Sequence, residues 1–299
     1  MHIEYTDCRL CARRCGVDRE SGVNGYCRSG AEMHISRADL HHWEEPIISG
    51  TNGSGTVFFS GCSLGCIYCQ NREISRGSVG RKISETELSE IMLDLQSKGA
   101  HNINFVTPTH YAPGVIAATK IARERGLLLP IVYNTGSYDT VDTIKKLRGT
   151  VDVYLPDYKY FRRKTAAALS GSADYPDVAF DAIREMVSQQ PVPVISDGIM
   201  KKGVIIRILL LPGHLAEAKL SVSRLYKAFG NSVYFSLMGQ YTVMPEMPHP
   251  LDRRVTVSEY SELVSYAEKQ GVINGFVQEL SSSATEYIPE FDIKSTTLN

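Results

Sequence analysis

The 299-residue sequence predicts an α/β fold, a partial (β/α)6 barrel of the TIM type preceded by a small N-terminal cysteine-rich segment. From residue 56 onward, short apolar runs alternate with helix-like stretches, as expected for repeated βα units. The apolar runs are not strictly alternating, which is typical of parallel strands covered by helices. A short polar cluster follows each run, and in a barrel such clusters converge on one face, where active sites lie.

Six apolar runs are the expected strands, near 56–60, 102–106, 130–134, 151–155, 203–211 and 232–238. Helices are expected near 84–98, 113–125, 139–148, 174–189, 215–229 and 258–270. Ser84 and Glu87 have the spacing of a capping box at the start of the first helix. Residues 272–277 are a candidate for one further strand. Six strands instead of eight predict an incomplete barrel with an open side, which suits a large substrate.

Composition divides the chain into three expected parts. Residues 1–50 have little periodicity, and no role is expected for their His41–Trp43 loop. A Gly/Ser/Asn stretch over 49–55 marks the boundary to the barrel, which occupies 51–280. The polar extension 281–299 is expected to wrap the surface.

The overall charge argues against some classes of partner. The chain has 32 Lys and Arg against 33 Asp and Glu, so it offers no general electrostatic reason to bind nucleic acid. No apolar run is long enough to span a membrane, and the polar N-terminus lacks the apolar core of a signal peptide. The sequence therefore predicts a cytoplasmic protein that binds neither nucleic acid nor membrane.

Seven cysteines, an odd number without a signal peptide, argue against a disulfide framework. They form two tight groups, which is how metal ligands are arranged. The first group comprises Cys8, Cys11, Cys15 and Cys27, and the second comprises Cys62, Cys66 and Cys69.

The second group has the spacing C-x3-C-x2-C. Three thiolates this close can hold three corners of a [4Fe–4S] cluster and leave one iron open to a ligand. Gly61 and Gly65 permit the sharp turns needed to wrap it. A zinc site is the main alternative, but no fourth ligand stands nearby. A disulfide with one free thiol is weaker still.

The first group has four ligands and can close either a zinc site or an auxiliary [4Fe–4S] cluster. Several arginines crowd the same segment, and they could offset thiolate charge, form a solvated face or dock an acidic partner. These arginines are Arg9, Arg13, Arg14, Arg19 and Arg28.

The three-cysteine spacing, with Tyr68 as the aromatic residue before the last cysteine, resembles the radical S-adenosylmethionine (radical SAM) superfamily. The string from Phe58 to Asn71, the N-terminal cysteines and the Tyr287–Asp292 tail are similar to its pyruvate formate-lyase activating-enzyme-like branch. The resemblance implies a [4Fe–4S] cluster whose open iron chelates S-adenosylmethionine (SAM), with Tyr68 near the adenine. An electron from a low-potential donor then cleaves SAM to a 5′-deoxyadenosyl radical, which takes a hydrogen from a substrate.

Under this resemblance the substrate is a glycyl radical enzyme, another protein or a small molecule. Thr107-Pro-Thr109-His110 stands where the family often has Gly-Gly-Glu, so these hydroxyls, the backbone or His110 must hold the methionyl amino group. Asn134 stands where the activating enzyme has an aspartate, which puts a cation site there in doubt.

The resemblance also extends to strand ends later in the chain. Lys159 is expected to bind the methionyl carboxylate, beside Asp157, and Arg207 and His214 are expected to line the nucleoside. Structural alternatives stand beside these roles: a strand-end ion pair of Asp157 and Lys159, a structural Arg207, and a His214 that only begins a helix. The competing functions are an iron–sulfur electron carrier or redox sensor and a zinc-stabilised interaction module.

Overall fold

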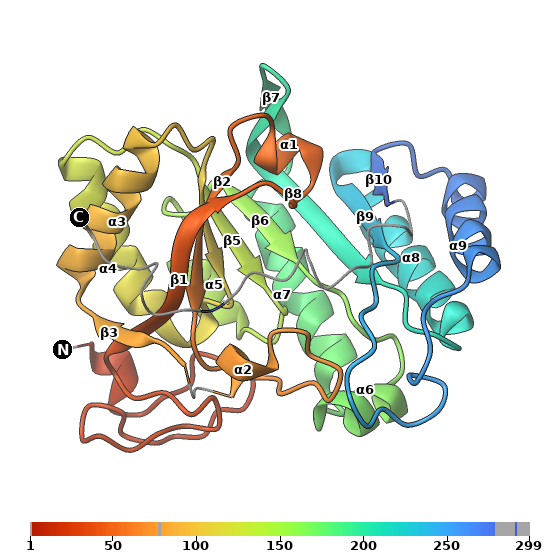
Figure 1. Ribbon diagram of the computed structural model, residues 1–299, viewed down its shortest axis with the longest axis horizontal. Helices are drawn as coiled ribbons and strands as arrows, with labels where there is room; N and C mark the ends of the chain where they lie inside the picture. The colour runs from red at the N-terminus through yellow and green to blue at the C-terminus, as the bar shows by residue number, and fades with distance from the viewer. Residues whose placement is uncertain (1, 77–78, 279–290, 292–299) are drawn as a thin grey trace.

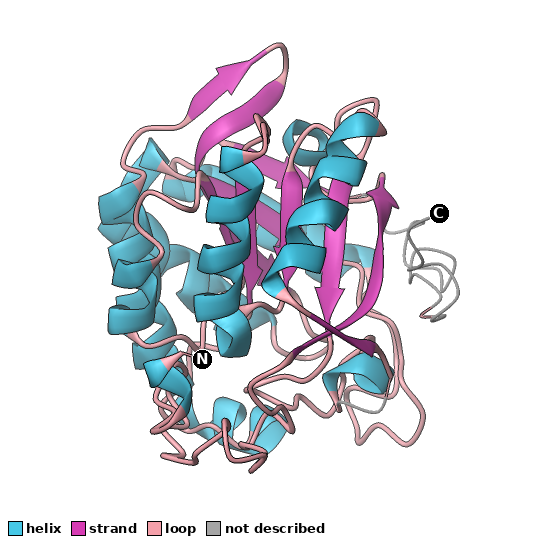
Figure 2. Cartoon of the chain, turned by 90° about the vertical axis from the view of Figure 1, so that its left-hand side faces the viewer, coloured by secondary structure: helices cyan, strands magenta, loops and turns pink. Residues whose placement is uncertain are grey.

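The fold is a curved sheet whose outer face is covered by helices (Figures 1 and 2). The computed structural model describes residues 2–76, 79–278 and 291. The extension expected over 281–299 and its Tyr287–Asp292 motif therefore lie outside the described residues, apart from Phe291. The predicted α/β class is confirmed.

Within the described residues, the sheet order is β10-β9-β8-β6-β5-β4-β2-β1-β3, with β7 paired to β8. The strands from β10 to β2 in this order run parallel to one another, whereas β1, β3 and β7 pair antiparallel. The strands are β1 (Met33–His41), β2 (Ser54–Phe59), β3 (Arg81–Ile83), β4 (Ile103–Val106), β5 (Ile131–Thr135), β6 (Val153–Pro156), β7 (Val194–Ser196), β8 (Ile199–Leu209), β9 (Tyr234–Met238) and β10 (Gly275–Val277).

All six predicted helices are present with ends close to those expected. The α-helices are α1 (Pro46–Ser49), α2 (Arg72–Ser75), α3 (Glu85–Ser97), α4 (Ala112–Glu124), α5 (Val141–Lys146), α6 (Arg163–Ser170), α7 (Tyr175–Gln189), α8 (Leu215–Phe229) and α9 (Val257–Gln270). The capping box of Ser84 and Glu87 is confirmed at the start of α3. The six expected strands and the further one near 272–277 are confirmed as β2, β4, β5, β6, β8, β9 and β10.

β1 is the main departure from the expected organisation. It pairs antiparallel with β2, from Ile35 opposite Phe59 to His41 opposite Ser54. The boundary expected at residue 50 therefore falls between two paired strands of one sheet. The sequence pattern missed β1 because most of its side chains remain partly exposed and several are polar or charged.

Side chains alternate along each strand, so the sheet has two apolar faces. Tyr133 and Tyr154 belong to the large outer core under the helices. On the inner face, Ile48 of α1 packs among four aliphatic residues of β5, β6 and β8, so α1 fills the inner side of the sheet. These four residues are Val132, Val153, Leu155 and Ile205.

Candidate functional site

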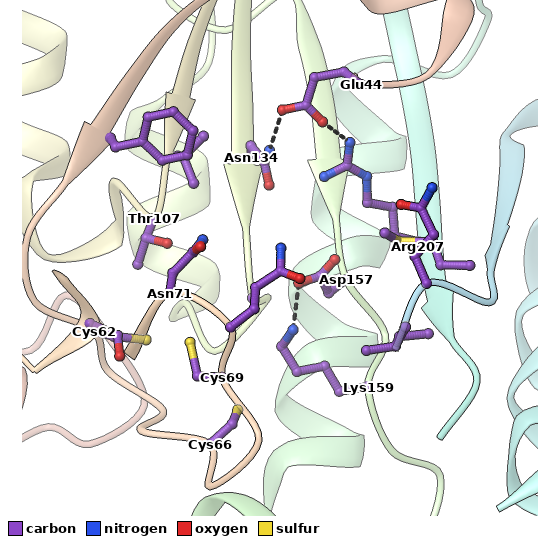
Figure 3. Close-up of a pocket in the computed structure, with 18 of the residues that line it drawn as sticks. Glu44, Cys62, Cys66, Cys69, Asn71, Thr107, Asn134, Asp157, Lys159 and Arg207 are labelled. Carbon is purple, nitrogen blue, oxygen red and sulfur yellow. Dashed lines mark hydrogen bonds and ion pairs between the residues drawn. The ribbon is translucent and has the colours of Figure 1, made fainter. Parts of the chain in front are cut away.

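A cavity of about 500 Å³ opens at the carboxyl ends of the parallel strands (Figure 3). Its volume lies within the range of small-molecule sites. Polar side chains face this cavity from three of the strands, and each lies two residues after an apolar residue of the inner face. Asn134 follows Val132 on β5, Asp157 follows Leu155 of β6, and Arg207 follows Ile205 on β8.

The three cysteines of the second group line this cavity from the loop between β2 and α2. Gly61 and Gly65 adopt φ values of 90° and 71° there, so the expected sharp turns are confirmed. A Cβ on Gly61 would lie 2.7 Å from the carbonyl oxygen of Cys27, which only glycine avoids. Burial, followed by the nearby thiols, raises the pKa of Cys62 to about 12. A bound metal is therefore needed to make this thiol a thiolate.

The cysteine groups are not closed around a metal ion in their present positions. Across the described parts of the chain, no three His, Cys, Asp or Glu side chains are gathered so as to hold a metal. Cys62, Cys66 and Cys69 nevertheless face one region of the cavity (Figure 3). Three thiols on one loop, with no fourth, fit a cluster that leaves one iron open.

Asp157 and Lys159 form an ion pair at the cavity wall, with Nζ 2.6 Å from Oδ2. Burial disfavours the charged amine, but Asp157 and the Cys66 and Cys69 thiols outweigh it and raise the pKa of Lys159. The backbone N–H of Lys159 donates to the hydroxyl of Tyr175 at 3.0 Å. Lys159 is thus a fixed positive charge that also lines the cavity.

Arg207 is held by two acidic residues that the sequence analysis missed. Its Nε donates to Glu45 Oε1 at 2.8 Å and its Nη2 to Glu45 Oε2 at 2.6 Å, and Nη2 also binds Glu44. Glu44 accepts from the amides of Asn104 at 2.9 Å and Asn134 at 3.4 Å. Burial would raise the pKa of Glu45, but the guanidinium outweighs it and holds that pKa low. Arg207 thus has two carboxylate partners and also lines the cavity.

The loop before α1 therefore supplies part of the cavity wall. His41 and His42, for which no role was expected, line the cavity together with Trp43 and the two glutamates. The available signal was chemical: a buried arginine in an apolar strand requires carboxylate partners.

Tyr68 lines the cavity and begins a chain of hydroxyls. Its OH lies 2.8 Å from the OH of Tyr160, which lies 2.6 Å from Ser170 Oγ. Ser170 Oγ in turn donates to Cys66 Sγ at 2.9 Å. This chain links the aromatic position of the motif to one cluster cysteine.

Thr107 and Thr109 also line the cavity. Thr107 has a φ of 58°, which is an outlier for a β-branched residue. Such strain persists where the surrounding structure enforces it, often at functional sites. Thr109 Oγ1 lies 3.2 Å from Thr135 Oγ1, so its hydroxyl is fixed within the wall.

His110 lies behind the cavity wall and is absent from the residues that line the cavity. Its Nε2 bonds the carbonyl of Ser60 at 2.8 Å, and its Nδ1 is buried without a hydrogen-bond partner. Burial and then the Arg19 charge lower the pKa of His110 to about 3. The neutral ring therefore donates from Nε2 to the carbonyl and presents no charge to a ligand.

His214 is likewise outside the main cavity. It precedes Leu215 at the start of α8, and its Nδ1 lies 2.8 Å from the carbonyl oxygen of Pro212. It lines a much smaller hollow beside Lys159. The alternative that His214 only begins a helix fits this position.

The N-terminal cysteines lie around a buried guanidinium. Cys8, Cys11 and Cys27 are buried, whereas Cys15 is exposed. Arg19 is 1% exposed, and its Nη1 lies 3.8 Å from Cys8 Sγ. Among the described residues no carboxylate lies within ion-pair distance of it, although a buried charge requires compensation. Thiolates on a metal would provide that compensation.

The five arginines of this segment do not act as one surface. Arg19 is buried, and Arg13 hydrogen-bonds the three-cysteine loop. Arg9 pairs with Asp7 at the surface, and Arg28 Nη1 donates to a backbone carbonyl. Arg13 and Arg19 direct their charges into the protein, so these two arginines cannot contribute to a docking patch for an acidic partner.

The chain is similar to one curated protein in sequence and to several solved proteins in fold. An uncharacterized protein of Methanocaldococcus jannaschii, MJ0674, is 29% identical over 277 residues, which cover 89% of this chain and 75% of that protein. Methylornithine synthase PylB is similar in structure, with a TM-score of 0.50 and 17% identity over 72% of this chain. Streptococcus suis SuiB bound to S-adenosylmethionine has a TM-score of 0.52 and 14% identity over 75% of this chain. The chain spans 62% of PylB and 50% of SuiB, and these likenesses concern the fold.

No described helix combines the length and apolar character needed to cross a membrane. The model of the Radical SAM superfamily matches residues 56–218, more than half of the sequence, including the loop with Cys62, Cys66 and Cys69. The chain therefore belongs to the radical SAM superfamily, whose members are enzymes and whose cofactors are a [4Fe–4S] cluster and SAM.

Proposed function

We propose that this radical SAM enzyme is an oxidoreductase of the pyruvate formate-lyase activating-enzyme-like branch, and that it takes a hydrogen atom from a protein substrate. A glycyl radical enzyme is the first candidate, and another protein or a small molecule is the alternative. The observation that carries the proposal is the position of the three-cysteine loop, which shares one cavity with the fixed charges of Lys159 and Arg207.

Cys62, Cys66 and Cys69 would hold the cluster. When bound and reduced by a low-potential donor, a [4Fe–4S] cluster with an open iron supplies the electron that cleaves SAM to a 5′-deoxyadenosyl radical. The remaining tasks, orientation and exclusion of side reactions, belong to the protein.

The cavity offers a matching group for each end of SAM. Lys159 stays charged and can bind the methionyl carboxylate, while Thr107 and Thr109 supply hydroxyl and backbone oxygens for the amino group. Tyr68 offers a ring and Asn134 an amide for the nucleoside. Arg207, fixed by Glu44 and Glu45, adds a rigid donor to the cavity wall.

A protein substrate is supported by the rim of the cavity. Trp43 lines it and is 61% exposed, and exposed tryptophans are enriched where proteins bind one another. A structure of SuiB with its precursor peptide SuiA has the same fold, with a TM-score of 0.50 and 14% identity over 78% of this chain. The cytoplasmic location stays a prediction.

We further propose that Cys8, Cys11, Cys15 and Cys27 hold a metal centre, either zinc or an auxiliary cluster. The support is the buried Arg19, whose charge lies against Cys8 and has no carboxylate partner among the described residues. Four thiolates on either centre carry the negative charge that it requires.

The test is anaerobic reconstitution followed by counts of iron, sulfide and zinc, with an assay for 5′-deoxyadenosine under strong reduction. About four iron per chain with one zinc assigns zinc to the N-terminal group, and about eight iron assigns a second cluster. Formation of 5′-deoxyadenosine supports catalysis, and a glycyl radical signal on a partner identifies the substrate class.

One observation keeps a second function open. The Thr107–His110 segment has no carboxylate for the methionyl amino group, which favours an iron–sulfur electron carrier or redox sensor. That protein would reduce its cluster reversibly without binding SAM. If the reconstituted protein holds an intact cluster but never yields 5′-deoxyadenosine, the electron carrier or redox sensor replaces the proposed enzyme.

A further inference from the structure

Arg13 connects the two cysteine groups. In sequence it lies between Cys11 and Cys15, but its side chain reaches the loop that carries the other group. Its Nε donates to the carbonyl of Ser63 at 2.9 Å and its Nη2 to that of Leu64 at 3.2 Å. Both carbonyls belong to the three residues between Cys62 and Cys66.

The same guanidinium also binds the end of α6. It donates to the carbonyls of Ser170 at 3.0 Å and Gly171 at 2.8 Å, and to Ser172 Oγ at 2.7 Å. The last carbonyls of a helix lack helical partners and carry partial negative charge, so a cation is favoured there. Arg13 thereby holds the cluster loop against the C-terminal end of α6.

The end of α6 in turn contacts the cluster loop directly. Ser170 Oγ donates to Cys66 Sγ at 2.9 Å, and the N–H of Ile67 donates to the carbonyl of Leu169 at 2.9 Å. A displacement of Arg13 would therefore act on Cys66 by two routes, through the loop carbonyls and through α6.

Two tyrosine rings contact the guanidinium of Arg13 and restrict its position. Its central carbon lies 3.8 Å from the ring centre of Tyr26 and 5.2 Å from that of Tyr138. Tyr26 directly precedes Cys27, so a second part of the N-terminal group contacts Arg13. Only the planar fork of arginine can bond several carbonyls and stack in this way, which lysine cannot reproduce.

We propose that Arg13 is a positioning residue that couples metal binding by the N-terminal cysteines to the geometry of the Cys62–Cys69 loop. Cys11 and Cys15 flank Arg13 in sequence, so a metal held by these two cysteines would fix the backbone between them. That backbone carries Arg13. The inference rests on the proposed function in two assignments, the N-terminal cysteines as a metal site and the second loop as the cluster site.

The test measures how fast each cysteine is alkylated in the metal-free full-length chain, at fixed pH, with and without Zn²⁺. Zinc bound by the N-terminal group is expected to slow alkylation of Cys66 about fivefold, within the range of couplings between contacting residues. In R13Q, zinc should bind equally well, but the alkylation of Cys66 should no longer respond to it.

Three further variants make the result specific. R9Q removes an exposed arginine of the same segment and should behave as the unsubstituted chain. R13K keeps the positive charge but not the planar guanidinium, so the response of Cys66 alkylation to zinc should be intermediate. If R13Q does not unfold cooperatively, R13K replaces it in the comparison with the unsubstituted chain. C15S removes an N-terminal ligand and should abolish the response of Cys66 to zinc.

Two results would overturn the proposal. Zinc protection of Cys66 that persists in R13Q or C15S would mean direct binding at the second loop, and an absence of protection in the unsubstituted chain would mean no coupling. In the reconstituted protein, R13Q should also change the electron paramagnetic resonance spectrum of the reduced cluster, whereas R9Q should not. Because alkylation requires neither iron nor SAM, a failure of the proposed catalysis leaves this test intact.

Discussion

The two cysteine groups differ in how they meet solvent and charge. Three of the four N-terminal cysteines are buried, and one of them, Cys8, contacts Arg19. In contrast, Cys62, Cys66 and Cys69 are partly exposed and line a cavity with Lys159. Metal sites show the same distinction, because structural sites are closed by protein ligands and catalytic sites keep an open position. The proposed function accordingly expects the first group to contribute stability and the second to carry the chemistry.

The comparison is tested most strongly by removing one cysteine from each group. C69S should abolish formation of 5′-deoxyadenosine but leave thermal unfolding nearly unchanged, because its thiol lies at the cavity. C27S should lower the free energy of unfolding by about 4 kcal/mol or more, as expected when a structural metal is lost. Product assays and denaturant unfolding of both reconstituted variants provide the measurement.

The matched control is C15S, which removes the exposed member of the N-terminal group. It also removes a ligand of the proposed metal, so it should lower stability as well, but less than C27S does because it creates no buried defect. The assignment fails if C69S destabilises the chain as much as C27S does.

The cavity side of the comparison depends on the charge of Lys159. K159M keeps the length of the side chain but removes the cation that the proposed function assigns to the methionyl carboxylate. A hydrogen bond to a charged group contributes about 1.5–3 kcal/mol, so the dissociation constant of SAM should rise about 10- to 100-fold. Equilibrium binding to the reconstituted protein measures it.

K164M is the control, because Lys164 is exposed on α6. If K159M binds SAM with unchanged affinity, the ion pair of Lys159 with Asp157 is a structural feature of the strand end and not part of the SAM site.

Much of the fold was predictable, because each parallel strand is a short apolar run and each long helix has an amphipathic pattern. β1 and α1 were not, since most side chains of β1 are partly exposed and α1 has only four residues. The three-cysteine loop was predictable from local spacing alone. The partners of Arg207 were not, because Glu45 precedes it by 162 residues and meets it only through the curvature of the sheet.

The pH dependence of stability tests the burial of His110, which lies behind the cluster loop. Its folded pKa is about 3 and that of an unfolded histidine is about 6.5, so the unfolded state binds the proton first. The stability that His110 contributes is present above pH 6.5 and is lost as the pH falls toward 3. Between pH 7 and pH 5 this loss is about 2 kcal/mol.

H110Q keeps a donor for the carbonyl of Ser60 and removes the titration. Urea unfolding should therefore show a smaller loss of stability between pH 7 and pH 5 than in the unsubstituted chain. H249Q, at an exposed histidine, should retain the full loss. An equal pH dependence in H110Q would place the ring of His110 in contact with solvent, contrary to its burial.

The smallest effect concerns strain at the cavity. Thr107 holds a φ of 58° that glycine adopts freely, so T107G should raise the free energy of unfolding by about 1 kcal/mol. It should also weaken SAM binding, because it deletes a hydroxyl from the cavity wall. Ser137 has a φ of 61° but is absent from the residues that line the cavity, so S137G should show the stabilisation alone. If both variants bind SAM equally well, the strained backbone at Thr107 serves the fold and not SAM binding. The contrast between a closed structural group and an open chemical group would then apply to the cysteines alone and not to the wall of the cavity at Thr107.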